Sequence, residues 1–292
     1  MSGSNITVII PTRDESLHIA RCVRSARPLG RVIVVDCGST DGTREIATAH
    51  GAEVVQHAWE GHAGQKNWAL RELDITTGWV LFLDADEYLP EAAAAEMREA
   101  VQAPSVAGYY VARRYIFLGQ ELKHAWWYPD YQLRLFRRAG ARCEDVQVHE
   151  HMIVAGEARP LRVAMMHENR KGLTAFIERH NRYAALEAAE IMNPGADRKH
   201  GSWTGSWADR RRAMKDRVWF RLPGRPLIRF AWLYVVKRGF LDGRRGLLFC
   251  GLIAMYELMI DAKLAERRLA ANAAAPDART GAVSEGETRA AA

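Results

Sequence analysis

Two aspartates separated by one residue follow an apolar run in the sequence WVLFLDADE. Asp84 and Asp86 stand directly after that run. Side chains at positions i and i+2 of an extended segment point to the same side, and paired carboxylates are ligands for hard cations such as Mg²⁺ or Mn²⁺. A cation held there would keep coordination positions open for the phosphate oxygens of a ligand. The alternative interpretation is a solvated acidic turn before a helix that starts near Pro90.

A further aspartate, Asp36, follows another apolar run, RVIVV, and precedes the turn-forming sequence CGSTDGT. A carboxylate at the end of a parallel strand can accept hydrogen bonds from a ribose hydroxyl or from the imide of a base. Ser39 and Asp41 have a simpler interpretation, because Ser and Asp build turns and cap helices. We therefore assign Asp36 to ligand binding and Asp41 to the start of a helix near Thr43.

Short apolar runs alternate with helical patterns up to about residue 120, and these elements must position the aspartates. The apolar runs predict strands over 6–10, 31–35, 52–57 and 79–83, and the helical patterns cover 16–26, 43–50 and 65–73. Fully apolar strands that alternate with helices indicate an α/β fold, with a mostly parallel central sheet flanked by helices on both faces. Ligands of such sheets bind beyond the carboxyl ends of the strands, where Asp36 and Asp84 stand.

The pattern changes after residue 108. Two β-type segments, GYYVARRYIF and YQLRLFRR, predict a second, mixed part of the same sheet, and residues 173–192 form a helical pattern that ends before Asn193-Pro194-Gly195. Long helical runs over 227–269 are interrupted at Gly239 and at Asp242-Gly243. We expect a sheet domain over 1–200, a helical extension over 201–270 and, because of its low-complexity composition, a disordered tail over 271–292.

The positive charge of the chain is concentrated in the extension. The 292 residues carry a net charge of +6, whereas the segment from Trp203 to Arg245 holds twelve Lys and Arg against three Asp. Aromatic residues alternate with these cations, a composition that suits the surface of an anionic membrane. A nucleic-acid surface has the same charge requirement, but it does not need the apolar run from Leu247 to Ile260 that follows. We expect a membrane contact and no nucleic-acid partner; a helix with a solvated basic face is the alternative.

The four cysteines have no spacing typical of a metal site, and the first residues lack the basic and apolar regions of a signal peptide. No apolar stretch reaches the length of about 18 residues that spans a bilayer. We expect a cytoplasmic protein that is peripheral on the inner face of the cytoplasmic membrane.

Several of these motifs together resemble family 2 glycosyltransferases. The residues that carry the resemblance are Pro11-Thr12-Arg13-Asp14-Glu15, the sequence VVDCGSTDGT, Gly64-Gln65-Lys66-Asn67 at a helix start, and LDADE. The resemblance implies a GT-A fold, a divalent cation (Mg or Mn) and an inverting mechanism. The sequence WYPDYQLRLFRR over 127–138, together with Val148-His149-Glu150 and GFLDG over 239–243, is similar to the branch that adds glucose to the lipopolysaccharide inner core.

The resemblance also implies a nucleotide-sugar site. Its expected members are Pro11, Thr12, Arg13, Glu15, Asp36, Gly64, Lys66 and Asp84. Lys66 fits this role because helix N-termini favour anions, although a solvated helix lysine is the plain alternative. Asp86 and Asp84 are the expected metal ligands, and His167 is a candidate for a third, with a structural histidine as the alternative.

An inverting transfer also needs a base that takes the proton of the acceptor hydroxyl. Glu150 is our choice because of its distance past Asp86 and its His-Glu-His context, but Glu144, Asp145 and Asp130 remain candidates, and Glu150 as a structural ion-pair partner is the alternative. Residues Trp127, Arg134 and Asp130 are expected to contact the acceptor or the diphosphate. The alternative for Arg134 is an outward-facing arginine on a strand, and the alternative for Trp127 is a tryptophan of the core.

The resulting hypothesis is an inverting, metal-dependent transfer of a hexose, with UDP-glucose as the expected donor. The expected acceptor is a lipid-linked glycan, foremost the lipopolysaccharide inner core, and a polyprenyl-diphosphate-linked exopolysaccharide acceptor is the nearest alternative. From another class, a basic nucleic-acid- or membrane-binding protein on a degenerate GT-A scaffold would explain the charge but leaves LDADE without a role. A dinucleotide-dependent oxidoreductase is disfavoured because no G-x-G-x-x-G follows residues 6–10.

Overall fold

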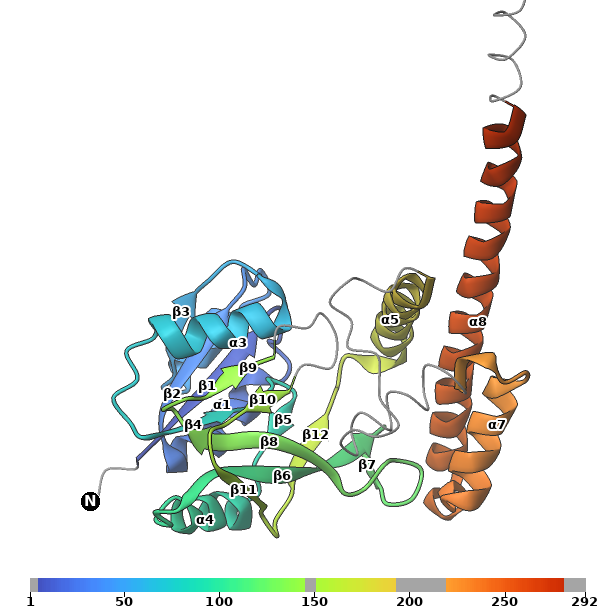
Figure 1. Ribbon diagram of the computed structural model, residues 1–292. Coiled ribbons are helices and arrows are strands. Elements are labelled where there is room, and N and C mark those ends of the chain that lie inside the picture. Colours follow the sequence, from blue (N-terminus) through green and yellow to red (C-terminus); the bar gives the residue numbers. More distant parts are fainter. Residues whose placement is uncertain (1–4, 145–150, 193–218, 281–292) are drawn as a thin grey trace, which may run out of the picture. The chain divides into compact units, whose positions relative to one another are not determined.

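The computed structural model describes residues 5–144, 151–192 and 219–280 (Figure 1). The chain divides into two compact units at Gly172. The boundary predicted near residue 200 falls in 193–218, outside the described residues, and stays a prediction. The helix α5 (Gly172–Met192) packs Ala184 and Ala188 against Ile260 and Leu264 of the second unit.

The N-terminal half of the sheet in the first unit is parallel, as predicted. Its strands are β1 (Ile6–Thr12), β2 (Gly30–Asp36), β3 (Glu53–Gln56) and β4 (Trp79–Phe82), in the order β3-β2-β1-β4. The residues of β1, β2 and β4 are almost all buried, which explains why these strands have continuous apolar sequences rather than alternating ones.

The other half of the sheet is mixed. β8 (Asp130–Arg137) pairs antiparallel with β4, and β6 (Val106–Phe117) pairs antiparallel with β8. β12 (Met165–Glu168) is parallel to β6 and carries β5 (Glu87–Tyr88) at its other edge. Four short strands complete the unit: β7 (Gln120–Leu122) and β11 (Glu157–Pro160) on β6, and the separate pair β9 (Arg142–Cys143) and β10 (Met152–Ile153).

Helices cover both faces of this sheet, and the side-chain alternation of the strands separates two cores. Ile6, Val8 and Ile10 of β1 face a core shared with α1 (Ile19–Ala26), α2 (Thr43–Ala49) and α4 (Glu91–Ala100). Ile9 points to the opposite face, where it packs with residues of α3 (Gly61–Glu72). The fold class is therefore the predicted one, an α/β sheet between two helical layers (Figure 1).

The second unit is helical. Besides α5 it contains η2 (Trp219–Arg221), α7 (Arg225–Ala231), the π-helical turn η3 (Trp232–Val236), the 3-10 turn η4 (Gly239–Asp242) and α8 (Gly243–Thr280). α7 and α8 lie side by side and are joined through η3 and η4 (Figure 1). The breaks at Gly239 and at Asp242-Gly243 are thus where the sequence predicted them, whereas α8 continues beyond residue 270.

A buried carboxylate fixes α7 on α8. Glu257 of α8 is 5% exposed and accepts hydrogen bonds from Arg229 (Nη2, 2.8 Å) and Arg225 (Nη1, 3.3 Å). Trp219 Nε1 donates to the same carboxylate at 3.2 Å, and Asp261 pairs with Arg225 as well. No helix in the described part of the chain is long and apolar enough to cross a membrane. The basic residues 210–217 lie outside the described residues.

The start of α8 makes a close backbone contact that allows a test of this packing. A Cβ atom on Gly246 would lie 2.1 Å from the carbonyl oxygen of Gly239, whereas a Cβ on Gly251 would meet nothing within 4 Å. We expect Gly246→Ala to lower the free energy of unfolding by about 1–3 kcal/mol, because backbone must move to admit the methyl group. The matched variant Gly251→Ala should stabilise the helix by up to about 1 kcal/mol. Urea unfolding followed by far-UV circular dichroism measures both, and equal stabilities would contradict the close approach.

Candidate active site

The parallel strands bring the motif residues of the first unit to one edge of the sheet. Thr12 and Asp36 are register partners at the ends of β1 and β2, and Asp84 follows the neighbouring strand β4. This is the carboxyl edge, at which ligands bind in parallel sheets.

Asp36 is buried and half satisfied. Its Oδ2 accepts hydrogen bonds from the backbone N–H groups of Gly38 (3.0 Å) and Ser39 (2.9 Å), and Arg44 Nε lies 3.9 Å away. Its Oδ1 is buried and has no hydrogen-bond partner among the described residues. Because a buried acceptor without a donor costs about 1–3 kcal/mol, this oxygen is suited to a donor supplied by a ligand.

The loops that follow β1 and β2 are tied together by side chains. Asp14 has a φ of 50°; its N–H donates to Ser39 Oγ (2.8 Å) and its Oδ1 accepts from the N–H of Thr40 (2.8 Å). Asp41 stands just before Gly42, the N-cap residue of α2, and accepts from the hydroxyl and the N–H (3.1 Å) of Thr43 and from the N–H of Ser16 (3.1 Å). Burial acts to raise the pKa of Asp41, but these hydrogen bonds lower it to about 2.

Glu15 forms an ion-pair and hydrogen-bond cluster rather than standing open to solvent. Its Oε2 lies 2.6 Å from Nδ1 of the fully buried His18, and its Oε1 accepts from Lys171 Nζ at 2.7 Å. His18 Nε2 accepts from the N–H of Arg170 (2.7 Å), so Nδ1 carries the proton that His18 donates to Glu15. Of the other predicted residues in this loop, Thr12 turns its hydroxyl inward onto the Ile10 carbonyl (3.0 Å).

The remaining residues of the first motif differ in exposure. Arg13 is 64% exposed and lies 3.8 Å from the Asp14 carboxylate, whereas Pro11 is half-buried within β1. Arg13 is therefore the side chain of this loop that is most accessible to a ligand.

Asp84 is joined to a buried arginine. Arg134 of β8 donates from Nη2 (2.5 Å) and Nη1 (3.2 Å) to the two carboxylate oxygens of Asp84, and its Nη2 also lies 3.0 Å from Glu87 Oε1. Glu87 is 1% exposed, and its Oε2 accepts from the N–H of Asp84 at 2.9 Å. Arg113 lies 3.7 Å from Glu87 and donates to Asp130 at 2.7 Å, so one charged network joins LDADE to the start of β8.

This network determines which carboxylate stays ionised. Burial acts to raise the pKa of Asp84, but the charges of Arg134, Lys66 and Arg113 hold it well below its usual range. The pKa of Glu87 is raised, first by burial and then by the charge of Asp84, against the opposing effect of Arg134. Asp84 is therefore an anion that already has a cationic partner, and Glu87 is the member that protonates more readily.

Asp86 lies beside a histidine and an amide. His167 Nε2 is 3.0 Å from Asp86 Oδ2, and Asn169 Nδ2 donates to the same oxygen at 3.2 Å. The other ring nitrogen of His167, Nδ1, is buried without a hydrogen-bond partner among the described residues. Among those residues no three His, Cys, Asp or Glu side chains converge as a complete metal site. Asp86 and His167 thus offer one oxygen and one nitrogen donor, which fits a divalent cation whose other positions are filled by a ligand.

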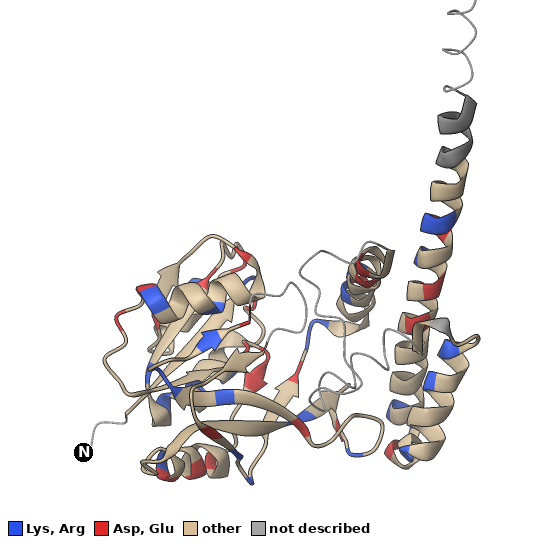
Figure 2. Cartoon of the chain, in the orientation of Figure 1, with Lys and Arg blue, Asp and Glu red and all other residues tan. Residues whose placement is uncertain are grey.

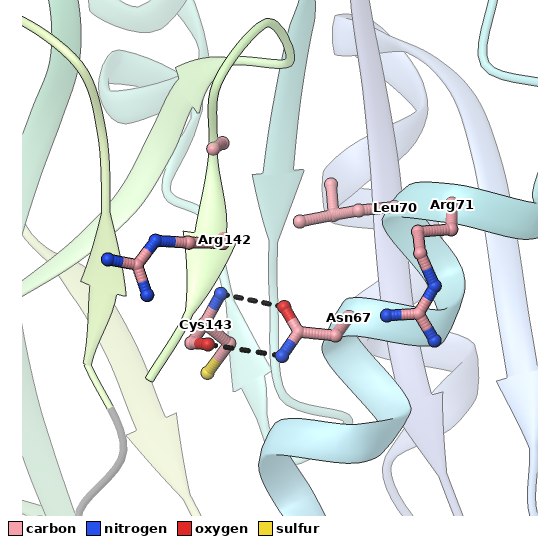
Figure 3. Close-up of a pocket in the computed structure, with 6 residues that line it drawn as sticks. Asn67, Leu70, Arg71, Arg142 and Cys143 are labelled. Carbon is pink, nitrogen blue, oxygen red and sulfur yellow. Dashed lines mark hydrogen bonds between the residues drawn. The ribbon is translucent and has the colours of Figure 1, made fainter. Parts of the chain in front are cut away.

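Helix α3 brings Lys66 to the same edge, where its charge lowers the pKa of Asp84. Gly64 lies in the first turn, and a Cβ there would be 2.9 Å from the Cβ of Glu60. The next residue of α3, Asn67, holds strand β9: its Oδ1 accepts from the N–H of Cys143 (2.8 Å) and its Nδ2 donates to the Cys143 carbonyl (3.1 Å). Asn67 and Cys143 line a pocket (Figure 3).

The predicted bases Glu150 and Asp145 lie outside the described residues. The residues on either side are described: the N–H of Glu144 donates to the carbonyl of His151 at 2.9 Å. Together with the Asn67 contact to Cys143, this links Glu144 and His151 to the strand that contacts α3.

The predicted acceptor contacts lie at the start of β8 and before it. Trp127 is 41% exposed, whereas its neighbour Trp126 stacks on Tyr115, with 4.9 Å between the ring centroids. Asp130 accepts hydrogen bonds from Arg113 and Gln132, so its carboxylate is engaged on both oxygens.

Sequence reasoning missed several residues of this site. Glu87 was visible as the last letter of LDADE but received no role, and Arg113, His18, Asn169 and Lys171 carried no local signal. Their importance comes from partners far along the chain, which only the folded register reveals.

The sheet between two helical layers is that of an α/β protein, and comparison with known proteins gives the family. Residues 7–168 match the family described as glycosyl transferase family 2. This match spans more than half of the chain, so the protein belongs to glycosyl transferase family 2.

Among similar proteins, the lipopolysaccharide core biosynthesis glycosyltransferase LpsC of Rhizobium meliloti is 26% identical over 265 residues, which cover 88% of this chain and 87% of LpsC. A glycosyltransferase of Rickettsia prowazekii is 44% identical over 87 residues, 30% of this chain and 29% of that protein. The predicted resemblance to a lipopolysaccharide-core branch is thereby confirmed as a similarity.

The similarity to solved structures is weaker. TarS of S. aureus in complex with UDP-GlcNAc has a TM-score of 0.44 at 15% identity, covering 87% of this chain and 81% of that one. Glucosyl-3-phosphoglycerate synthase of Mycobacterium tuberculosis, in complex with Mn²⁺, UDP-glucose and phosphoglyceric acid, has a TM-score of 0.34 at 24% identity, covering 39% and 45%.

The buried network predicts a large effect at Glu87. In Glu87→Gln, the amide NH₂ group would face either the Asp84 N–H or the Arg134 guanidinium, both of which are donors. We expect a loss of about 2–4 kcal/mol in the free energy of unfolding. Glu121→Gln, which alters the partly exposed pair with Arg114, is the matched control and should change stability by less than about 0.5 kcal/mol. Urea unfolding compares the two, and similar small effects would show that the network does not stabilise the fold.

Proposed function

We propose that this glycosyltransferase is inverting and metal-dependent, and that it transfers a hexose, glucose from UDP-glucose, to a lipid-linked glycan. The observation that carries the proposal is that three features lie at one edge of the sheet: Asp36 Oδ1, which lacks a partner within the described part of the chain, the Asp84 cluster and the Asp86 cluster. One buried acceptor, the Asp84–Arg134 ion pair and the Asp86 carboxylate beside an imidazole suit a ligand that has a polar base, a ribose and a diphosphate.

The nucleoside end is assigned to Asp36. Its Oδ1, which has no hydrogen-bond partner among the described residues, would accept an N–H or O–H of the base or ribose, and the loop of Pro11 to Glu15 would contact the same ligand. Arg13 supplies an exposed guanidinium there. Glu15 and Thr12 act by holding the loop, because their polar atoms are already engaged within the protein.

The diphosphate end is assigned to the cations and to the metal ligands. Lys66 near the start of α3 and Arg134 on Asp84 are positively charged groups that would attract it. Asp86 and His167 would hold the divalent cation, with Asp84 next to them. When bound, the cation supplies neutralisation of the negative charge on the diphosphate leaving group.

The transfer itself requires a single displacement. The acceptor oxygen forms a bond to the anomeric carbon as the bond from that carbon to the diphosphate breaks, and UDP leaves with the electron pair. The acceptor proton passes to a base, which we assign to Glu150, with Glu144 and Asp145 as the alternatives. Trp127, half exposed near the start of β8, is assigned to stacking on the acceptor sugar.

The acceptor is proposed to be the lipopolysaccharide inner core. This assignment is supported by the similarity to LpsC, which extends over nearly the whole chain, including the helical second unit. A lipid-linked acceptor also places the enzyme at a membrane surface, on the cytoplasmic face.

Calorimetric titration tests the donor site first. We expect UDP and UDP-glucose to bind in the presence of Mn²⁺ and to bind at least about tenfold more weakly after EDTA is added, since the cation screens the diphosphate. Asp36→Asn should weaken UDP binding by about tenfold, because an amide places a donor among donors. Absence of nucleotide binding in the folded protein would contradict the proposed function.

The metal assignment is tested at Asp86. Asp86→Ala should lower glucosyl transfer by about a hundredfold or more while the protein stays folded, because charge stabilisation at the leaving group is lost. Asp74→Ala, an exposed aspartate outside the site, is the control and should retain activity. Full transfer by a folded Asp86→Ala protein would rule out the metal role.

The base assignment is tested by isosteric substitution. Glu150→Gln should retain UDP binding and lose turnover by about a hundredfold or more, because only proton removal from the acceptor is affected. Glu144→Gln and Asp145→Asn are measured in parallel under the same conditions. Whichever of the three variants loses turnover with UDP binding intact identifies the base, and an active Glu150→Gln enzyme would exclude our choice.

A further inference from the structure

The turn that joins α7 to α8 exposes apolar side chains to an unusual extent. We call residues 235–248 the hairpin tip; they comprise the end of η3, all of η4 and the first turns of α8. Its large apolar side chains are each between 46% and 60% exposed: Val235, Val236, Phe240, Leu241, Leu247 and Leu248. Exposed apolar side chains gathered within fourteen residues of one turn suit an interaction site.

The same tip carries basic residues and almost no opposing charge. Lys237, Arg238, Arg244 and Arg245 alternate with the apolar positions, and Figure 2 shows Lys and Arg along this hairpin. The only acidic residue of the tip sequence, Asp242, is 4% exposed. The accessible surface of the tip is therefore apolar and positively charged.

The hairpin places charge inside and apolar groups outside. Arg225 is fully buried and pairs with Glu257 and Asp261, whereas Leu227, two residues further on, is 76% exposed. In a helical hairpin whose outer surface faces only water, we would expect the leucine to be buried and the arginine to be solvated. The buried ion pairs and the close contact of Gly246 with Gly239 hold the two helices together without using these apolar side chains.

We propose that the hairpin tip inserts its apolar side chains into the surface of an anionic lipid bilayer. Phe240 and Leu241 would enter the boundary between headgroups and acyl chains, and the arginines would extend to lipid phosphates. A second copy of the chain is a poorer occupant, because it would bring an identical set of positive charges against the first. The inference rests on the proposed function in one respect: a lipid-linked acceptor lies at the same surface.

Vesicle sedimentation with the full-length protein tests the proposal. We expect binding to phosphatidylglycerol-containing vesicles that weakens with added salt, and weaker binding to pure phosphatidylcholine vesicles. The double variant Phe240→Glu and Leu241→Glu should reduce partitioning by at least about tenfold, as should the double variant Arg244→Glu and Arg245→Glu. Leu269→Glu, which alters a 70% exposed leucine near the other end of α8, is the matched control and should bind like the native protein.

UDP calorimetry and light scattering on the same variants separate the outcomes. Native-like vesicle binding by the folded Phe240 and Leu241 variant overturns the tip assignment, even where UDP binding supports the proposed enzyme. Conversely, vesicle binding that depends on the tip, without any UDP binding, supports the tip and contradicts the donor site. A native dimer that this double variant converts to monomers, with no vesicle binding by either protein, would show that the tip is a contact between copies and would overturn the proposal.

Discussion

The buried guanidinium of Arg134 is the contact on which the candidate site depends. It lies between Asp84 and Glu87, two carboxylates that are otherwise close, partly or fully buried and of like charge. Without that cation, burial and mutual repulsion would drive one of them to take up a proton or turn outward. The pairing of β8 with β4, in which Leu135 stands opposite Leu81, brings Arg134 to the end of β4. The antiparallel half of the sheet thus supplies the cation that stabilises the buried carboxylates which follow β4.

Strand β12 and the residues that follow it contact the same edge of the sheet. His167 lies within hydrogen-bond distance of Asp86, Glu168 pairs with Arg21, and Lys171 pairs with Glu15. Each contact joins the end of the first unit to a segment more than eighty residues earlier. The last strand therefore adds a further set of contacts to the loops after β1 and β4, which Ser39 and Arg134 already hold. The family match, which reaches residue 168, spans nearly the whole of this arrangement.

The sequence predicted the parts of the molecule whose signal is local. Continuous apolar runs identified β1, β2 and β4, and position after such a run was enough to select Asp36 and Asp84. The roles of Glu87 and Arg113 depend on which residue stands opposite on another strand, and composition does not encode that register. Glu15 and Thr12 were predicted from their motif as nucleotide-binding residues, and that role stays a prediction. The motif did not indicate that the Glu15 carboxylate accepts from Lys171 or that the Thr12 hydroxyl donates to the Ile10 carbonyl, because those partners depend on the fold.

The second unit shows why charge counting alone could not describe the basic extension. Arg225 and Arg229 belong to that positive segment, yet both form ion pairs with the buried Glu257. Removing these cations from the surface costs desolvation free energy, which the ion pairs and the stacking of Arg229 on Trp219 offset. Among the described residues of this segment, Arg238, Arg244 and Arg245 are exposed at the turn, where apolar side chains are also exposed. The unit thus uses buried ion pairs as well as apolar packing to hold its helices together, and neither involves the exposed apolar side chains of the hairpin tip.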